Sequence, residues 1–195
     1  MHPDNDAIIA VTRAWLETIV IGLNLCPFAK AVHVKNQIRF VVSCAHNSDA
    51  LLDDLERELQ LLAKADPEQI DTTLLIHPDV LAAFFDYNDF LDLCDSVVEE
   101  LKLDGILQVA SFHPQYQFAD TEIDDVANFT NRSPYPTLHL LREDSVTRAV
   151  ETFPDVDAIY EKNIATMRRL GKQKIETLVS VIDRIPPADD DVNSR

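Results

Sequence analysis

Hydrophobic residues recur at steps of three to four positions in several long segments, which is the spacing of one buried face of a helix. In the first of these segments, Ile8, Val11, Trp15 and Ile19 fall on one side. Turn-forming residues such as Pro27 and Gly171 follow the ends of such segments. The pattern predicts helices over 6–23, 49–65, 87–103, 146–153, 156–170 and 172–184.

Shorter segments are rich in β-branched and aromatic residues, which is typical of strands. The segment 106–112 is apolar on both faces, so we expect it at the centre of a sheet. For 137–142 a strand is preferred to a helix, because Asp144 and Ser145 can then cap the helix that follows. The pattern predicts strands at 37–44, 72–76, 106–112 and 137–142, with a short partner strand at 32–34.

This order of elements predicts an α/β layered sandwich with a mixed sheet of about four to five strands flanked by helices, plus extra C-terminal helices. Helices separate the first long strands, so parallel neighbours are expected there. A ferredoxin-like α+β arrangement is the alternative. The length of 195 residues is typical of one domain, and we expect residues 1–185 to form a single globular domain. Residues 186–195 are expected to be a disordered acidic tail.

The net charge of −17 argues against partners that are themselves strongly negative. Binding to nucleic acid depends mostly on lysine and arginine neutralising phosphates, so we expect no nucleic-acid partner and no membrane partner. No apolar run reaches the ~18 residues that a spanning helix needs, and no basic segment typical of a secretion signal precedes the first helix. Cys26, Cys44 and Cys94 are odd in number and far apart, which argues against a disulfide framework and favours the cytoplasm.

Residues 113–136 show no periodicity, and a connection of this length is unusual unless it has a function. His113 directly follows the strand expected at the centre, where ligand crevices of open α/β sheets lie. We predict that it acts as an acid or base, and the alternative is a hydrogen-bonded structural histidine. Arg132 lies beside Pro134, which stiffens the loop, and is our favoured anchor for a carboxylate or phosphate.

Cys26 follows the first predicted helix, and the negative end of a helix dipole raises the pKa of a thiol. A buried structural cysteine is therefore favoured, and a nucleophilic role requires His113 or His139 beside it. Arg142 is a second candidate anion contact, although an ion pair with Glu143 or Asp144 is the ordinary alternative. The candidate catalytic residues are His113, Cys26 and His139, and the candidate ligand-binding residues are Arg132, Arg142, Tyr116, Asn131 and Ser133.

Metal binding is a further alternative, because Cys26, His113, His139 and Glu143 are residue types that ligate zinc or iron. No spacing such as CxxC, HxH or HExxH supports it, so we predict no metal ligand. Only three glycines occur, and neither a dinucleotide fingerprint nor a P-loop is present. The sequence identifies no cofactor and no oligomeric state.

Four motifs together carry a resemblance to a known family. They are Asn24-Leu25-Cys26-Pro27-Phe28-Ala29, Phe112-His113-Pro114-x-Tyr116-x-Phe118, Asn131-Arg132-Ser133-Pro134-Tyr135-Pro136 and Leu138-His139-Leu140-Leu141-Arg142-Glu143. With these motifs the sequence resembles a bacterial family of domains of unknown function, the one numbered 1415, over about residues 7–185. The resemblance implies a single-domain bacterial protein and supplies no reaction.

The leading functional hypothesis is an uncharacterised cytoplasmic enzyme or enzyme-like domain that binds a small anionic substrate at a His/Arg/Cys cluster. The alternatives are a non-catalytic protein-interaction module and a Cys/His metal-binding protein. The environment of His113 and Arg132 discriminates between the first two hypotheses. If internal hydrogen bonds saturate both side chains and no pocket lies beside them, the non-catalytic interaction module is favoured and the motifs in this loop are architectural.

Overall fold

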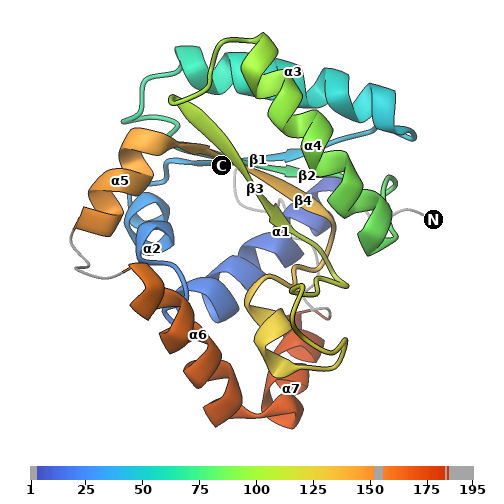
Figure 1. The fold of residues 1–195 in the computed structure, drawn as a ribbon, viewed down its shortest axis with the longest axis vertical. Coiled ribbons are helices and arrows are strands. Elements are labelled where there is room, and N and C mark those ends of the chain that lie inside the picture. Colours follow the sequence, from blue (N-terminus) through green and yellow to red (C-terminus); the bar gives the residue numbers. More distant parts are fainter. Residues whose placement is uncertain (1–3, 152–155, 183, 185–195) are drawn as a thin grey trace, which may run out of the picture.

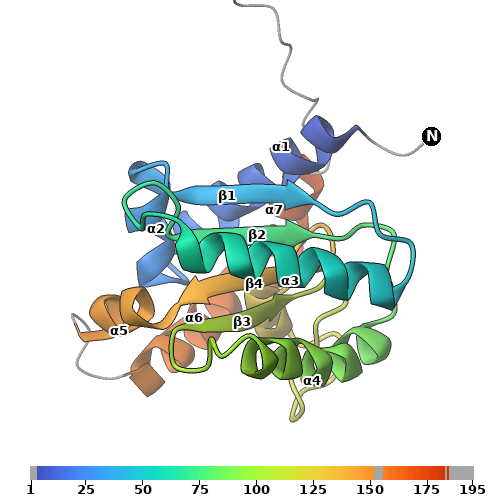
Figure 2. The ribbon, with the colours of Figure 1, turned by 90° about the horizontal axis from the view of Figure 1, so that it is seen from above.

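Four strands form one mixed sheet in the computed structural model, in the order β1-β2-β4-β3 (Figure 2). The structure describes residues 4–151, 156–182 and 184. β1 is parallel to β2, whereas β4 runs antiparallel to both of its neighbours, β2 and β3. The strands are Ile38–Val42 (β1), Thr72–Ile76 (β2), Leu107–Phe112 (β3) and Thr137–Arg142 (β4).

Helices cover both faces of this sheet. Figure 1 shows α3 and α4 together on one face, and α1, α2, α5, α6 and α7 on the other. No helix among the described residues is long and apolar enough to cross a membrane. The helices are α1 (Asn5–Trp15), which continues as a π-helix (Leu16–Ile21), α2 (Pro27–Val34), α3 (Ser48–Lys64), α4 (Phe84–Glu100), a 3₁₀-helix (Val126–Thr130), α5 (Glu143–Glu151), α6 (Val156–Leu170) and α7 (Lys172–Ile182).

The alternation of side chains along each strand gives the two faces different cores. Leu75, Leu138 and Leu140 pack toward α3 and α4, and all three are fully buried. Leu74 and Leu141 point to the opposite face, toward α2 and α5. Full burial of each such leucine stabilises the fold by about 1.5–3 kcal/mol, so this alternation fixes the register of the sheet.

The mixed sheet flanked by helices confirms the predicted α/β layered fold. The parallel pairing expected among the first three strands holds for β1 and β2, whereas β3 pairs antiparallel with β4. Two further local predictions were wrong. β3 is an edge strand, because β4 inserts between β2 and β3. β3 nevertheless packs against α4 on one face, and its Ala110 and Phe112 line a cavity on the other, which explains its apolar pattern. The expected strand at 32–34 belongs to α2, which Pro27 begins at a first-turn position that favours proline. The expected tail at 186–195 lies outside the described residues.

Candidate functional site

An apolar cavity of about 220 Å³ lies between the sheet and the helices α1, α2, α5 and α6. An engineered cavity of about 150 Å³ binds benzene, so the present volume corresponds to a ligand of about nine non-hydrogen atoms. The strands contribute Ile38, Thr72, Leu74, Ala110, Phe112, His139 and Leu141. The helices and their connections contribute Trp15, Leu16, Val20, Cys26, Pro27, Phe28, Ala29, Val32, Val146, Ala149, Val150 and Ile159.

The π-helix after α1 shapes one wall of this cavity. The amide of Gly22 donates to the carbonyl of Glu17 at 2.9 Å, and the amide of Leu25 donates to the carbonyl of Val20 at 2.8 Å. Both bonds span five residues, and such wide turns are rare and often occur at functional sites. A Cβ at position 22 would lie 2.4 Å from the carbonyl oxygen of Thr18, so only glycine fits there.

Cys26 lies where the chain turns from the π-helix into α2. Asn24 has a φ of 54°, a left-handed conformation that asparagine tolerates, and it redirects the chain. Cys26 is the residue that precedes the first turn of α2. Burial raises the pKa of its thiol, while the backbone amides of Ala29 and Phe28 act in the opposite direction. The expected direction of the shift is therefore right, but its main cause is burial rather than the end of the preceding helix.

His139 lines the same cavity from the middle of β4. Its Nε2 lies 2.8 Å from the hydroxyl oxygen of Thr72, which donates its own hydrogen to the carbonyl of Leu140 at 2.6 Å. Because that hydroxyl has a single hydrogen, Nε2 is the donor and Nδ1 carries no proton. Burial lowers the pKa of His139 to about 4, although part of its surface remains accessible. The imidazole is therefore neutral near pH 7.

Two of the three candidate catalytic residues, Cys26 and His139, thus share one cavity. His113 lies elsewhere. Its ring packs against Tyr87 and Phe84 of α4, the helix on the opposite face of the sheet, with centroid distances of 5.0 and 5.5 Å.

Both ring nitrogens of His113 are occupied by internal bonds. Nε2 donates to the carbonyl of Leu81 at 3.1 Å, and Nδ1 accepts from the amide of Gln115 at 3.0 Å. The residue has no exposed surface, and burial lowers its pKa. These contacts are those of a structural histidine that fixes the exit from β3.

Arg132 binds main-chain carbonyls of its own loop. Its Nε donates to the carbonyl of Tyr116 at 3.1 Å, and its Nη2 donates to the carbonyl of Ile123 at 2.6 Å. The guanidinium also stacks on Phe129, 4.7 Å from the ring centroid. Arg132 therefore folds the segment 113–136 onto itself.

The other candidate ligand contacts in this loop also make internal bonds. Ser133 donates its hydroxyl hydrogen to the carbonyl of Tyr135 at 2.6 Å. The carbonyl of Asn131 accepts from the amide of His113 at 3.2 Å. The ring of Tyr116 lies 5.1 Å from that of Phe84. All three residues help to order the loop.

Arg142 and His113 lie at opposite ends of the paired strands β3 and β4. In the antiparallel pair, Phe112 is opposite Thr137 and Leu107 is opposite Arg142. The two ends are therefore separated by most of the strand length, about 17 Å. The single cluster of histidine and arginine expected from the sequence is split between them.

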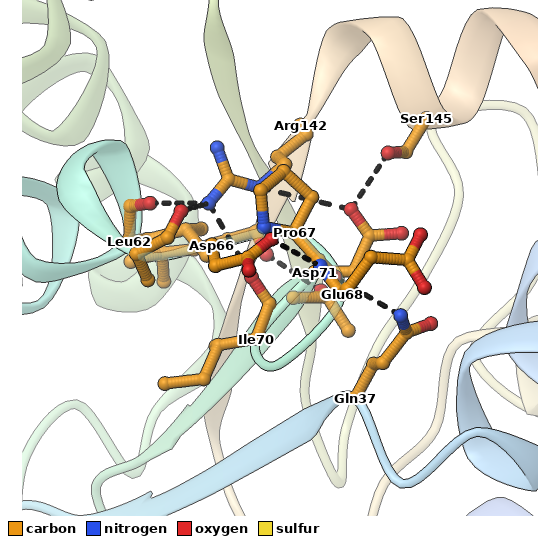
Figure 3. A network of polar contacts seen from close by, with 12 residues as sticks. Gln37, Leu62, Asp66, Pro67, Glu68, Ile70, Asp71, Arg142 and Ser145 are labelled. Atoms are coloured by element: carbon orange, nitrogen blue, oxygen red, sulfur yellow. Dashed lines mark hydrogen bonds and ion pairs between the residues drawn. The ribbon is translucent and has the colours of Figure 1, made fainter.

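Figure 3 shows the Arg142 guanidinium directed at the end of α3. Nη2 donates to the carbonyls of Leu62 at 2.6 Å and Ala65 at 2.7 Å. Nε lies 3.7 Å from a carboxylate oxygen of Asp71, which also accepts from the Ser145 hydroxyl at 2.6 Å. Arg142 thus satisfies carbonyls at the C-terminus of α3 and joins this helix to β4 and α5.

Sequence reasoning identified only Cys26 and His139 among the cavity residues and missed the others, including Trp15, Thr72 and Ala110. Trp15 is the single tryptophan of the chain, and its indole N–H has no hydrogen-bond partner among the described residues. Thr72 is a polar residue in a strand that is buried along its whole length. A hydroxyl inside such a strand is a signal for a buried polar contact, but the sequence does not indicate the partner.

The metal alternative receives no support from the geometry. Across 4–151, 156–182 and 184, no three or more His, Cys, Asp or Glu side chains form a group that could hold a metal ion. His113 and His139 lie in different environments, as described above, so the four candidate ligands noted in the sequence do not form one centre.

Comparison with known proteins gives one match. No curated protein and no solved structure matches the chain. Residues 7–177 match the family described as "Protein of unknown function (DUF1415)", and the chain therefore belongs to this family.

Proposed function

We propose that this protein binds a small, neutral and largely apolar molecule in the cavity between the sheet and α1, α2, α5 and α6. The observation that carries the proposal is the composition of the wall. Among the described residues of the wall, only Trp15, Cys26, Thr72 and His139 have a nitrogen, oxygen or sulfur atom in the side chain. Thr72 and His139 bond to each other, and no aspartate, glutamate, lysine or arginine of the part of the chain that the structure describes lines the cavity.

An anionic ligand fits this wall poorly. A carboxylate or phosphate in the cavity would be a buried charge without a partner, which is costly. The arginines considered as anion anchors donate to main-chain carbonyls instead: Arg132 in its own loop and Arg142 at the end of α3. A neutral ligand therefore replaces the small anionic substrate of the sequence-based hypothesis, while Cys26 and His139 remain the residues that face it.

Acetophenone and benzoate test this proposal as a pair, because they are similar in shape and differ in charge. Isothermal titration calorimetry should detect saturable binding of acetophenone at one site and no binding of benzoate. Replacement of Ala110 by leucine fills the cavity from β3 and should abolish the binding of acetophenone.

The matched control is Ala50→Leu, because Ala50 packs on the α3–α4 side of the sheet. This variant has the same added volume and should bind acetophenone like the wild type. Absence of acetophenone binding in the wild type, or equal binding in the Ala110→Leu variant, would overturn the proposal.

A further inference from the structure

A second cavity, of about 700 Å³, lies between α2, α5 and the connection from α3 to β2. Its volume is within the range of about 300–1,000 Å³ that is typical of small-molecule sites. Unlike the apolar cavity, it is lined by charged side chains of both signs, Lys35, Asp66, Glu68, Asp71 and Arg148. We propose that this cavity binds a zwitterionic α-amino acid with an apolar side chain.

Asp71 supplies a carboxylate oxygen for the ammonium group of such a ligand. The residue is only 8% exposed, and its backbone amide donates to the carbonyl of Gln37 at 2.9 Å. Oδ1 accepts from the hydroxyl of Ser145 at 2.6 Å and lies 3.7 Å from Nε of Arg142 (Figure 3). Oδ2 makes no hydrogen bond with the described residues and is not enclosed by them. It is therefore an acceptor held at a fixed position in the wall of the cavity.

The hydroxyl of Ser145 joins Asp71 to Arg148. It donates its single hydrogen to Asp71 and accepts from Nη2 of Arg148 at 2.8 Å. The guanidinium of Arg148 forms no ion pair with the described residues, so it is available to a carboxylate. An acceptor for an ammonium group and a donor for a carboxylate thus lie two hydrogen bonds apart. This arrangement matches an α-amino acid, whose two charged groups share one carbon atom.

A ligand with one charge matches the wall less well. A simple anion would meet the three carboxylates of Asp66, Glu68 and Asp71. A simple cation would meet the positive charges of Lys35 and Arg148. Since like charges repel, each of these ligands gains at one part of the wall and loses at another. A zwitterion can place each of its charges beside the opposite charge.

The rest of the wall is suited to an aliphatic side chain. Its residues belong to α2 and α5 and carry no charge: Pro27, Phe28, Ala31, Val32 and Ala149. Four of them, all except Ala31, also line the apolar cavity, so the two cavities are neighbours. The experiment therefore has to assign the ligand to one of the two.

L-Leucine and two analogues test the proposal, because each analogue lacks one of the charges. Isoamylamine is leucine without the carboxylate, and 4-methylpentanoate is leucine without the ammonium group. In ¹H–¹⁵N spectra of the full chain at neutral pH, leucine should shift the amide resonances of Asp71 and Ser145 to saturation. Each analogue should bind about tenfold more weakly, because it loses a charged hydrogen bond.

Two variants remove the partners of the two charges. Asp71→Asn keeps Oδ1 and replaces Oδ2 by an amide group, so the affinity for leucine should fall about tenfold while that for 4-methylpentanoate should not fall. Arg148→Met should weaken leucine to a similar extent and leave isoamylamine unaffected. Arg148 is exposed, so this variant serves if Asp71→Asn does not fold. Arg57→Met removes an exposed arginine outside the cavity and should bind leucine like the wild type.

Three results would overturn the proposal: no shift of the cavity amides with leucine, equal binding of leucine and both analogues, or wild-type affinity for leucine in Arg148→Met. Ala110→Leu fills the apolar cavity, and it should lose acetophenone and keep leucine. Loss of leucine in this variant would place leucine in the apolar cavity and also overturn the proposal. A wild-type protein that binds leucine but not acetophenone would retain the charged site and lose only the apolar one.

Discussion

Nε2 of His139 donates a hydrogen bond to the hydroxyl oxygen of Thr72 across the β2–β4 pair, at 2.8 Å. His139 is opposite Leu74 in this pair, so the bond reaches diagonally across the face that lines the cavity. The bond fixes the tautomer of the imidazole and leaves Nδ1 without a proton. The chemistry available at the cavity therefore depends on a threonine in the neighbouring strand.

Thr72→Val tests this relationship with little change in volume. It leaves the N–H of His139 buried without its acceptor, and we expect the free energy of unfolding to fall by about 1–3 kcal/mol. Thr72→Val combined with His139→Phe removes both partners, so the double variant should lose less stability than the sum of the single variants. Urea unfolding of the four proteins measures this coupling, and strict additivity would contradict the assigned bond.

The buried histidines predict a loss of stability in mild acid. The pKa of His139 and that of His77 are lowered to about 4, in both cases mainly by burial. The same groups titrate near 6.5 in an unfolded chain. As the pH falls from about 6.5 toward 4, the unfolded chain binds protons that the folded chain does not, so each histidine removes about 1.4 kcal/mol of stability per pH unit.

The measurement is the free energy of unfolding in urea at several values between about pH 5 and 6.5, a range above most carboxylate titration. In the His139→Phe variant, the slope of this free energy against pH should be smaller by the contribution of one histidine. An unchanged slope in this variant would show that His139 titrates alike in the folded and unfolded chains.

The periodicity of the sequence was sufficient for most of the fold. The leucines of 49–65 and the strand residues at 72–76 and 137–142 gave elements that match α3, β2 and β4 closely. The sequence did not reveal the order of the strands, because β3 carries apolar residues on both faces even though it is an edge strand. β4 pairs with β2 and β3 through contacts between residues far apart in the sequence, and local patterns do not encode such contacts.

The candidate site was predictable only in part. Cys26 and His139 were identified by residue type and motif, and the fold places them at one cavity. The side chains of His113 and Arg132 are also of types that bind or react with ligands. In the folded protein, however, their polar atoms bond to main-chain groups of nearby loops. Which polar side chains satisfy the backbone and which face a cavity depends on tertiary contacts, and sequence spacing does not contain them.

Arg142→Met should destabilise the protein without affecting ligand binding. It removes the hydrogen bonds to the carbonyls of Leu62 and Ala65 and leaves the buried Asp71 without its cation. We expect a loss of about 3 kcal/mol in the free energy of unfolding. Arg57→Met is the control, because Arg57 is largely exposed and its loss should cost no more than about 0.5 kcal/mol.

Arg132→Met should loosen the loop that it ties together. Without the bonds to Tyr116 and Ile123, amide hydrogen exchange over residues 114–125 should accelerate. Exchange in β2 should not change. Acetophenone affinity should stay at the wild-type value, and a large loss of affinity in the folded variant would restore Arg132 as a ligand contact.

The most direct test of the central claim uses Trp15. This residue lies on the cavity wall and is the single tryptophan of the chain, so one indole resonance in a ¹H–¹⁵N spectrum reports on the cavity. We predict that acetophenone shifts this resonance to saturation in the wild type and in Ala50→Leu, and leaves it in place in Ala110→Leu. A resonance that does not move in the wild type, or moves equally in Ala110→Leu, would contradict a ligand site in this cavity.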